Sequence, residues 1–167
     1  MKIIFLDFDG VLNSWRFFKD SHANGLLLFR PADQIDPKAI RWLNELITKS
    51  GAKVVVSSAW RLLHTLDELR AMLGEKGFAG EVIDRTESLS WQMVERGPIV
   101  AKAQRGDEID LWVRAHAEVE SFVILDDDSD MAMHAGRLVQ TSCRKGLKQI
   151  HVEQAIALLE SPAQEQP

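Results

Sequence analysis

The sequence predicts an α/β fold with a central, mostly parallel sheet. An uninterrupted apolar run at residues 3–6 is typical of a strand that is buried on both faces. A helical apolar pattern between Asp36 and Gly51 then leads to a second such run at residues 52–56. Strand, helix and strand in this order form a right-handed crossover between parallel strands. A third run, at residues 122–125, repeats the first pattern late in the chain.

Capping signals and apolar spacing predict the other elements. Asp36 and Pro37 supply an N-cap and a proline at the first helical position. A second amphipathic helix is expected over residues 62–74, with its buried side formed by Leu62, Leu63, Leu66, Leu69 and Leu73. Short strands are expected at residues 81–84 and 137–142, and a helix led by acidic residues follows Arg105. The stretch 146–160 predicts a closing helix that packs on the sheet through Ile150, Val152, Ile156, Leu158 and Leu159.

Two connecting segments show neither a helical nor a strand-like period of hydrophobic residues. In residues 13–36, Asn24-Gly25 is a hairpin signal, so we expect a small flap, a hairpin or a turn of helix, folded back over the end of the first strand. Its aromatic side chains either seal the edge of the core, as such clusters usually do, or face a substrate. In residues 85–104, Pro98 breaks any helix that begins at 91–94, which favours a loop or short insert over a separate cap domain.

Length and composition predict one domain over residues 1–160 and a disordered tail over 161–167. The chain has 167 residues, 46% of them hydrophobic, which suits one core of ordinary size. The net charge of -5 argues against tight nonspecific attraction to a phosphate backbone but permits a local basic groove. No apolar run has the length of a membrane span, and no cleavage-like site follows the first run. With Cys143 as the single cysteine, we expect a cytoplasmic protein without an internal disulfide.

Aspartates follow two of the apolar runs directly. Asp7 and Asp9 come after the first, with Gly10 allowing a sharp turn, and Asp126 and Asp127 come after residues 122–125. Because the carboxyl ends of parallel strands meet at one edge of a sheet, we expect these carboxylates to converge. Like charges this close repel unless a divalent cation lies among them, and hard oxygen ligands indicate Mg²⁺. The alternative for the second group is an ordinary acidic surface turn.

Hydroxyl and cationic side chains are expected at the same edge. Ser57 and Ser58 end the second strand, where their hydroxyls can bind phosphate oxygens or merely cap a turn. Arg105 precedes a helix at that side of the sheet, and its alternative role is that of a solvated cation at a helix start. Ser57 and Ser58 remain alternatives for phosphate binding, and Lys102 is a weaker candidate than Arg105.

With these four sequence motifs, the chain resembles the haloacid dehalogenase (HAD) superfamily of phosphotransferases. The resemblance rests on the DFDGV sequence that begins at Asp7, on Ser57 after AKVVV, on Arg105, and on Asp126-Asp127 after FVIL. VVVSSAWR, RGDEIDLW and VILDDD also resemble the small HAD domains of Swiss-army-knife RNA-repair proteins. The resemblance implies a three-layer, Rossmann-like HAD core with a minimal cap, the short flap after the first strand.

The same resemblance implies a Mg²⁺-dependent phosphatase. Asp7 would attack phosphorus and form an aspartyl-phosphate, and Asp9 would act as general acid and then general base. Ser57 or Ser58, with Arg105, would bind the transferring phosphoryl group. Asp7, the backbone carbonyl of Asp9 and Asp127 would hold Mg²⁺, with Asp126 as a further ligand or an orienting group; the two roles could be exchanged.

The substrate is less well defined by the sequence. A short flap and no cap leave an open site, which suits a nucleotide or a nucleic-acid end. Five residues are candidate substrate contacts: Asn13, Trp15, Arg16, Trp60 and Arg61. Arg16, Lys19, Arg30 and Arg61 could hold a nucleic-acid backbone or be solubilising charges, and Trp15 or Trp60 could stack on a base or pack in the core. A small-metabolite phosphatase and a catalytically idle binding module are the alternatives; no membrane partner is expected, and the sequence leaves the oligomeric state, the natural substrate and any partner kinase or ligase open.

Overall fold

A five-stranded parallel sheet forms the centre of the molecule. The computed structural model describes residues 1–89 and 103–161, and within them the strand order is β3-β2-β1-β4-β5. The strands are β1 (Lys2–Leu6), β2 (Lys53–Val56), β3 (Val82–Arg85), β4 (Ser121–Asp126) and β5 (Leu138–Gln140). All four pairings are parallel, so the predicted α/β class and Rossmann-like core are confirmed.

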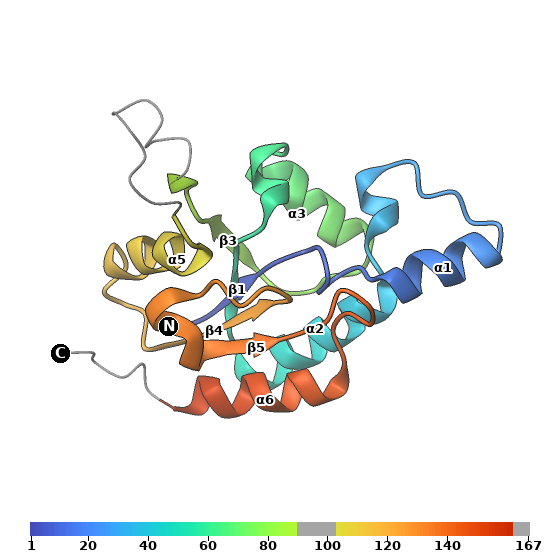
Figure 1. Ribbon diagram of the computed structural model, residues 1–167. Coiled ribbons are helices and arrows are strands. Elements are labelled where there is room, and N and C mark those ends of the chain that lie inside the picture. The colour runs from blue at the N-terminus through green and yellow to red at the C-terminus, as the bar shows by residue number, and fades with distance from the viewer. Residues whose placement is uncertain (90–102, 162–167) are drawn as a thin grey trace.

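Helices cover both faces of this sheet (Figure 1). One face packs on α2 (Pro37–Ser50), α3 (Leu66–Glu75) and α6 (Gln149–Glu160) through a continuous apolar cluster that contains Leu6, Val56 and Leu125. The other face packs on α5 (Arg105–Arg114) through Phe5, Trp112 and their neighbours. Because β1 and β4 lie between these layers, their apolar runs are fully buried, as the uninterrupted sequence pattern predicts.

The strand order places a switch point between β1 and β4. From β1 the chain moves through β2 to β3 on one side, and then it crosses the sheet to β4 on the other side. In open α/β sheets, ligands bind outside the carboxyl ends of the strands at such a point. The register pairs Leu6 with Leu125, so the residues that follow β1 and those that end β4 lie side by side.

Of the two forms predicted for the flap, a hairpin or a turn of helix, the structure has a helix. Residues Trp15–Ala23 form α1, and it begins where the Ser14 hydroxyl accepts a hydrogen bond from the Phe17 backbone N–H. Asn24 caps the end of this helix, and Gly25 has a φ of 71°, so the Asn24-Gly25 signal ends a helix rather than turning a hairpin. The short 3-10 helix η1 (Pro31–Gln34) completes the connection to α2.

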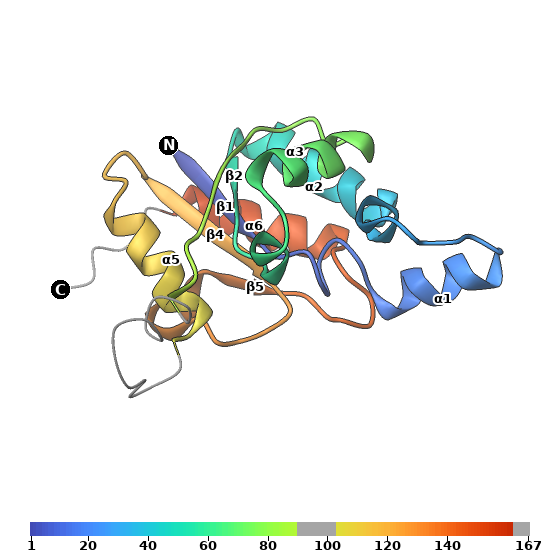
Figure 2. The same cartoon turned by 90° about the horizontal axis from the view of Figure 1, so that it is seen from above.

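This helix projects away from the sheet (Figures 1 and 2). The expectation that the segment folds back over β1 is therefore wrong, and so is the expectation that its aromatic residues seal the core. Trp15 is 73% exposed and Phe29 is 81% exposed. The Trp15 and Arg16 N–H groups donate to the Cys143 and Arg144 carbonyls, which ties the start of α1 to the loop after β5 and not to the core.

The other helix predictions need two corrections. Residues Ala59–Leu62 form the 3-10 helix η2, and α3 begins only at Leu66, where Thr65 provides a capping box with Glu68. Leu62 and Leu63 are consequently exposed and do not line the buried side. In α6, Ile150 is also exposed, because it lies in the first turn, outside the face that packs on the sheet. The fifth strand, predicted over residues 137–142, is shorter in the structure, because Arg137 ends a third 3-10 helix, η3 (Ala132–Arg137), and β5 ends at Gln140.

Four further predictions concern other parts of the chain. The expected 85–104 insert, with Trp91, Val94 and Pro98, lies mostly outside the described residues, as does the 162–167 part of the expected tail. Within the ranges 1–89 and 103–161, no helix combines the length and the apolarity that a membrane crossing requires. Cys143 is exposed and is not in a disulfide.

The joint between α5 and the loop after β4 depends on Gly106. A Cβ at this position would lie 2.0 Å from the Met131 carbonyl oxygen. The Gly106 N–H donates to the Asp130 carbonyl and the Arg105 N–H to the Asp130 carboxylate, so this loop satisfies the first turn of α5.

We predict that Gly106→Ala lowers the free energy of unfolding by about 2–3 kcal/mol, because helix and loop must separate. Gly74→Ala is the matched control: nothing lies within 4 Å of its added Cβ, and alanine in that helix should stabilise by about 0.5–1 kcal/mol. Urea denaturation of both variants is the measurement. Equal effects of the two substitutions would contradict the close packing at Gly106.

Candidate active site

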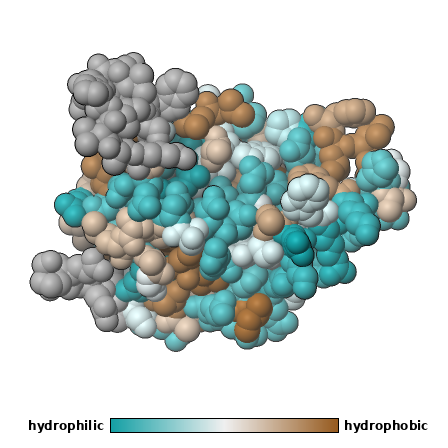
Figure 3. Space-filling view, viewed as in Figure 1, coloured by the Kyte–Doolittle hydropathy of each residue, from teal (hydrophilic) through white to brown (hydrophobic). Residues whose placement is uncertain are grey.

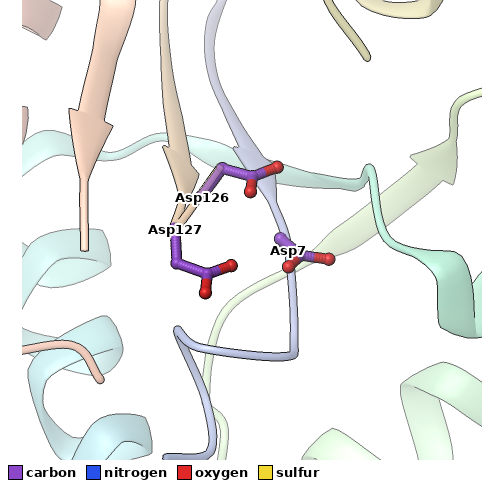
Figure 4. Close-up of side chains that lie close together, drawn as sticks. All are labelled: Asp7, Asp126 and Asp127. Atoms are coloured by element: carbon purple, nitrogen blue, oxygen red, sulfur yellow. The ribbon is translucent and has the colours of Figure 1, made fainter. Parts of the chain in front are cut away.

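Three carboxylates meet where β1 and β4 end (Figure 4). Asp7, Asp126 and Asp127 each offer a ligand oxygen within 4.8 Å of the others. The pairing of Leu6 with Leu125 sets Asp7 level with Asp126, and the Asp7 N–H donates to the Leu125 carbonyl at 2.9 Å. Asp7 and Asp126 are buried, while Asp127 is partly exposed. The structure therefore brings three of the four predicted aspartates together, and the Asp9 carboxylate is not part of this group.

Burial and mutual repulsion disfavour ionisation of this cluster. The pKa of Asp7 is raised to about 6, chiefly by burial, against which the Ser58 hydroxyl and the Arg105 charge act. The pKa of Asp126 is raised to about 7 by burial and by the charge of Asp7. Burial also raises the pKa of Asp127. A bound cation would favour the ionised forms, because it replaces lost hydration with direct attraction.

The loop from Asp7 to Asn13 is fixed by Gly10. This residue has a φ of 71°, and a Cβ on it would lie 2.3 Å from the Asp127 carboxylate. The buried Thr141 hydroxyl donates to the Gly10 carbonyl at 2.7 Å and anchors the loop to the end of β5. Glycine is thus required here both for its backbone conformation and for the close approach of Asp127.

Asp9 follows Asp7 by two residues, and both of its oxygens accept hydrogen bonds. The Asn13 side-chain amide donates to Oδ1 at 2.8 Å, and the Trp60 indole N–H donates to Oδ2 at 2.9 Å. Asn13 also accepts from the Gly10 N–H, and the Trp60 ring lies 5.0 Å from that of Phe8. Two of the candidate substrate contacts, Asn13 and Trp60, are therefore buried residues that hold Asp9 in place.

The two serines after β2 have different surroundings. Ser57 is buried, and its hydroxyl lies 3.5 Å from that of Thr86. The Ser58 hydroxyl caps η2 by accepting from the Trp60 N–H at 3.4 Å, and it also interacts with the Asp7 carboxylate, whose pKa it lowers. Of the two hydroxyls, that of Ser58 is thus the one that contacts the acidic cluster.

Arg105 approaches the cluster from α5. Its guanidinium Nε lies 3.8 Å from Asp126 Oδ2, and its Nη1 lies 3.6 Å from Glu108 Oε2. It is partly exposed, so it offers N–H groups toward the cluster from the start of a helix. Lys102, the weaker candidate for this role, lies outside the described residues.

Arg61 forms a buried network behind these groups. It donates to the Ser58 carbonyl at 2.6 Å, to the Thr86 carbonyl at 3.0 Å and to Glu108 Oε2 at 2.5 Å. Of the two roles predicted for Arg61, that of a solubilising surface charge is wrong, because its side chain is only 4% exposed. It fixes the ends of β2 and β3, and its partner Glu108 also faces Arg105. Sequence reasoning missed Glu108 because an acidic residue in a first helical turn is a common N-terminal feature.

The remaining candidates are exposed residues on α1 and at η1, and their ion pairs involve carboxylates outside the acidic cluster. Trp15 and Arg16 are exposed on α1, and Arg16 forms a surface ion pair with Asp20 at 3.6 Å. Lys19 is exposed on the same helix. Arg30 bonds to Asp33 and Glu75, which makes it part of a surface salt-bridge group at η1 and α3.

The donor set fits a divalent cation. Asp7, Asp126 and Asp127 supply hard carboxylate oxygens from neighbouring strand ends, and Arg105 is the nearby cation that compensates part of their charge. Two of the three carboxyls have pKa values of about 6 and 7, as expected of a cluster that needs a positive charge to be fully ionised.

The parallel sheet and this cluster are consistent with a domain of the HAD superfamily, whose members typically use a divalent metal. A protein-family model described as the HAD domain in Swiss Army Knife RNA repair proteins matches residues 3–152. The chain therefore belongs to this family, and the predicted resemblance is confirmed. A search of curated proteins gives no match to the chain. The family indicates a hydrolase of the phosphatase type.

The raised pKa values predict that the metal-free protein loses stability as the pH rises from about 5 to 8. The unfolded chain ionises its aspartates near pH 4, whereas folded Asp7 and Asp126 keep protons up to pH 6–7, so the stabilisation by these protons disappears through that window. Mg²⁺ should raise the melting temperature more at pH 8 than at pH 5, because it binds the ionised carboxylates.

Thermal denaturation with EDTA or Mg²⁺ tests this. Asp126→Asn should flatten the pH dependence of the metal-free protein and reduce the Mg²⁺ effect. Asp67→Asn, at a carboxylate that is 90% exposed on α3, should leave both unchanged. A metal-free protein that becomes steadily more stable from pH 5 to 8 would contradict the raised pKa values.

Proposed function

We propose that the chain is a Mg²⁺-dependent phosphomonoesterase that works through an aspartyl-phosphate on Asp7 and acts on a nucleotide or a nucleic-acid end. The observation that carries this proposal is the arrangement around Asp7. Its carboxylate lies among two further carboxylates, the Ser58 hydroxyl and the Arg105 charge, and Asp9 stands two residues away on a fixed loop. This arrangement provides a nucleophile, a site for a cation, hydrogen-bond donors for phosphoryl oxygens and a separate acid.

In the first step, an Asp7 oxygen forms a bond to phosphorus, and the bond from phosphorus to the leaving oxygen breaks. Asp9 transfers its proton to that oxygen, so that an alcohol leaves. The N–H groups of Asn13 and Trp60 orient the Asp9 carboxyl, and each of its oxygens keeps a lone pair that can carry the proton. Ser58 and Arg105 donate to the phosphoryl oxygens as charge shifts among them.

In the second step, water attacks phosphorus and the bond to Asp7 breaks. Asp9, now ionised, accepts the proton of that water, which restores the starting state of both carboxyls. When bound by Asp7, Asp126 and Asp127, Mg²⁺ supplies charge neutralisation for the phosphoryl group and the nucleophile. Arg61 and Glu108 contribute indirectly, since they hold the Ser58 backbone and face Arg105.

Two observations support the proposed substrate class. The matching family is described by its occurrence in RNA repair proteins. The helix α1 projects outward and does not fold back over β1, an arrangement that suits a bulky substrate such as a polynucleotide end (Figure 2). A cytoplasmic location belongs to the same proposal and is compatible with a free, exposed Cys143.

Phosphate release tests the activity. The wild type should hydrolyse an aryl phosphate and 3′- or 5′-phosphorylated oligonucleotides with Mg²⁺ but not with EDTA. Asp7→Asn should lower the turnover about 10³-fold or more, because the nucleophile is lost. Asp67→Asn is the exposed carboxylate control. Full turnover in EDTA or by Asp7→Asn would contradict the mechanism, and turnover restricted to small phosphates would favour the metabolite alternative.

The role of Trp60 in orienting Asp9 gives a second prediction. Trp60→Phe keeps a ring against Phe8 but removes the N–H that bonds to Asp9. We expect kcat to fall about tenfold for alkyl phosphates and less for aryl phosphates, because a good leaving group depends less on a general acid.

Trp112→Phe is the matched control for this effect. It also removes an indole hydrogen bond, at 2.7 Å to Asp84, but it lies in the opposite helical layer. A comparison of kcat for both substrates and of melting temperatures separates positioning from packing. An equal loss of alkyl phosphate turnover in the two variants would refute the role of Trp60.

A further inference from the structure

The start of α1 and the loop after β5 form a surface whose residues have no role in the proposed phosphate hydrolysis. Two hydrogen bonds join them, from the Trp15 N–H to the Cys143 carbonyl at 2.9 Å and from the Arg16 N–H to the Arg144 carbonyl at 3.2 Å. Their side chains line one shallow hollow. We call it the α1 strip, and its lining residues are Trp15, Arg16, Phe18, Lys19, Asp20 and Arg144.

The aromatic side chains of α1 are unusually accessible. Ser21 is the only buried residue of this helix, although Trp15, Phe17 and Phe18 make up a third of it. Trp15 is 73% exposed in the hollow. A separate group of exposed hydrophobic residues lies over the segment that follows α1 (Figure 3); it includes Leu27 and Phe29, which do not line the hollow. Trp15 and Phe18 line the hollow together, so aromatic surface is open to a ligand there.

Positive charge concentrates at the same place. Residues 15–23 and 141–148 together contain five Lys or Arg and one Asp or Glu, whereas the whole chain contains 20 and 25. Lys19, Arg144 and Lys145 have no carboxylate partner within residues 1–89 and 103–161. A protein with a net charge of -5 thus presents a local cationic surface that includes an exposed indole ring.

The α1 strip begins next to the candidate active site. Asn13, which donates to Asp9, precedes Trp15 by two residues, so their Cα atoms are at most about 7 Å apart. Gly146, in the same loop as Arg144, packs against the Val11 and Asn13 carbonyls, and the Leu147 N–H donates to Val11. Both sides of the strip are therefore attached to the loop that carries Asp7 and Asp9.

We propose that the α1 strip binds single-stranded nucleic acid next to the terminal phosphate, with a base stacked on Trp15 and backbone phosphates on Lys19 and Arg144. Unpaired cations around an exposed aromatic ring are the combination that binds single strands without sequence preference. A protein partner is disfavoured, because the cations would then need acidic partners in register. This inference rests on the proposed function and specifies the substrate as a strand of several nucleotides.

The test measures binding and catalysis separately. Anisotropy of a labelled, unphosphorylated oligouridylate reports the strip alone. Trp15→Ala should weaken its affinity about tenfold through lost stacking. Lys19→Ala with Arg144→Ala should weaken it and reduce the slope of log affinity against log salt by about 0.7 for each cation removed. All three substitutions should lower kcat/KM for a phosphorylated oligonucleotide relative to an aryl phosphate.

Two controls lie outside the strip. Phe29→Ala removes an exposed aromatic ring, and Lys49→Ala removes an exposed cation at the far end of α2, so both should leave oligonucleotide affinity unchanged. Unchanged affinity in the strip variants, or equal losses in the controls, would overturn the inference. Strip-dependent binding by a wild type that hydrolyses no phosphomonoester would support the strip and refute the proposed function. Turnover of phosphorylated oligonucleotides and mononucleotides with equal KM would support the proposed function and refute binding of a strand by the strip.

Discussion

Three carboxylates within 4.8 Å of one another are the constraint on which the rest of the site depends. The parallel register of β1 and β4 holds Asp7 beside Asp126, and the tight approach of Gly10 holds the loop against Asp127. Burial raises the cost of their charges, as the elevated pKa values of Asp7 and Asp126 show. The fold supplies this rigidity, because both strands are buried on both faces and cannot relax away from one another.

The neighbouring residues form two supports around this cluster. On one side, Asn13 and Trp60 bind both oxygens of Asp9, the proposed acid, and hold its carboxylate in place. On the other side, Arg61 joins the ends of β2 and β3 and meets Glu108, which also faces Arg105. A charged network of this kind is stable when buried because each Arg61 nitrogen has a partner. Both supports come from residues beyond the acidic motifs themselves.

The strands and the acidic cluster could be predicted because each depends on a short stretch of sequence. Continuous apolar runs followed by aspartates define β1 and β4, and strand ends at one edge must meet. Two other contacts could not be predicted from the sequence: that of Trp60 with Asp9 and that of Arg61 with Glu108. They join residues that are 51 and 47 positions apart. The position of α1 also escaped prediction: an aromatic-rich segment usually packs inward, but here its start bonds to the loop after β5 and leaves Trp15 exposed.

Covalent capture of the phosphoryl group is the most direct test of the central claim that Asp7 is the nucleophile and Asp9 a separate acid and base. Asp9→Asn with an aryl phosphate and Mg²⁺ should still undergo the first step, since an aryl leaving group needs little protonation, but should stall before water attack. Mass spectrometry should then find one added phosphoryl group on the peptide containing Asp7 and none in Asp7→Asn. A phosphoryl group on another residue, or phosphate release by Asp9→Asn at the wild-type rate, would contradict the account.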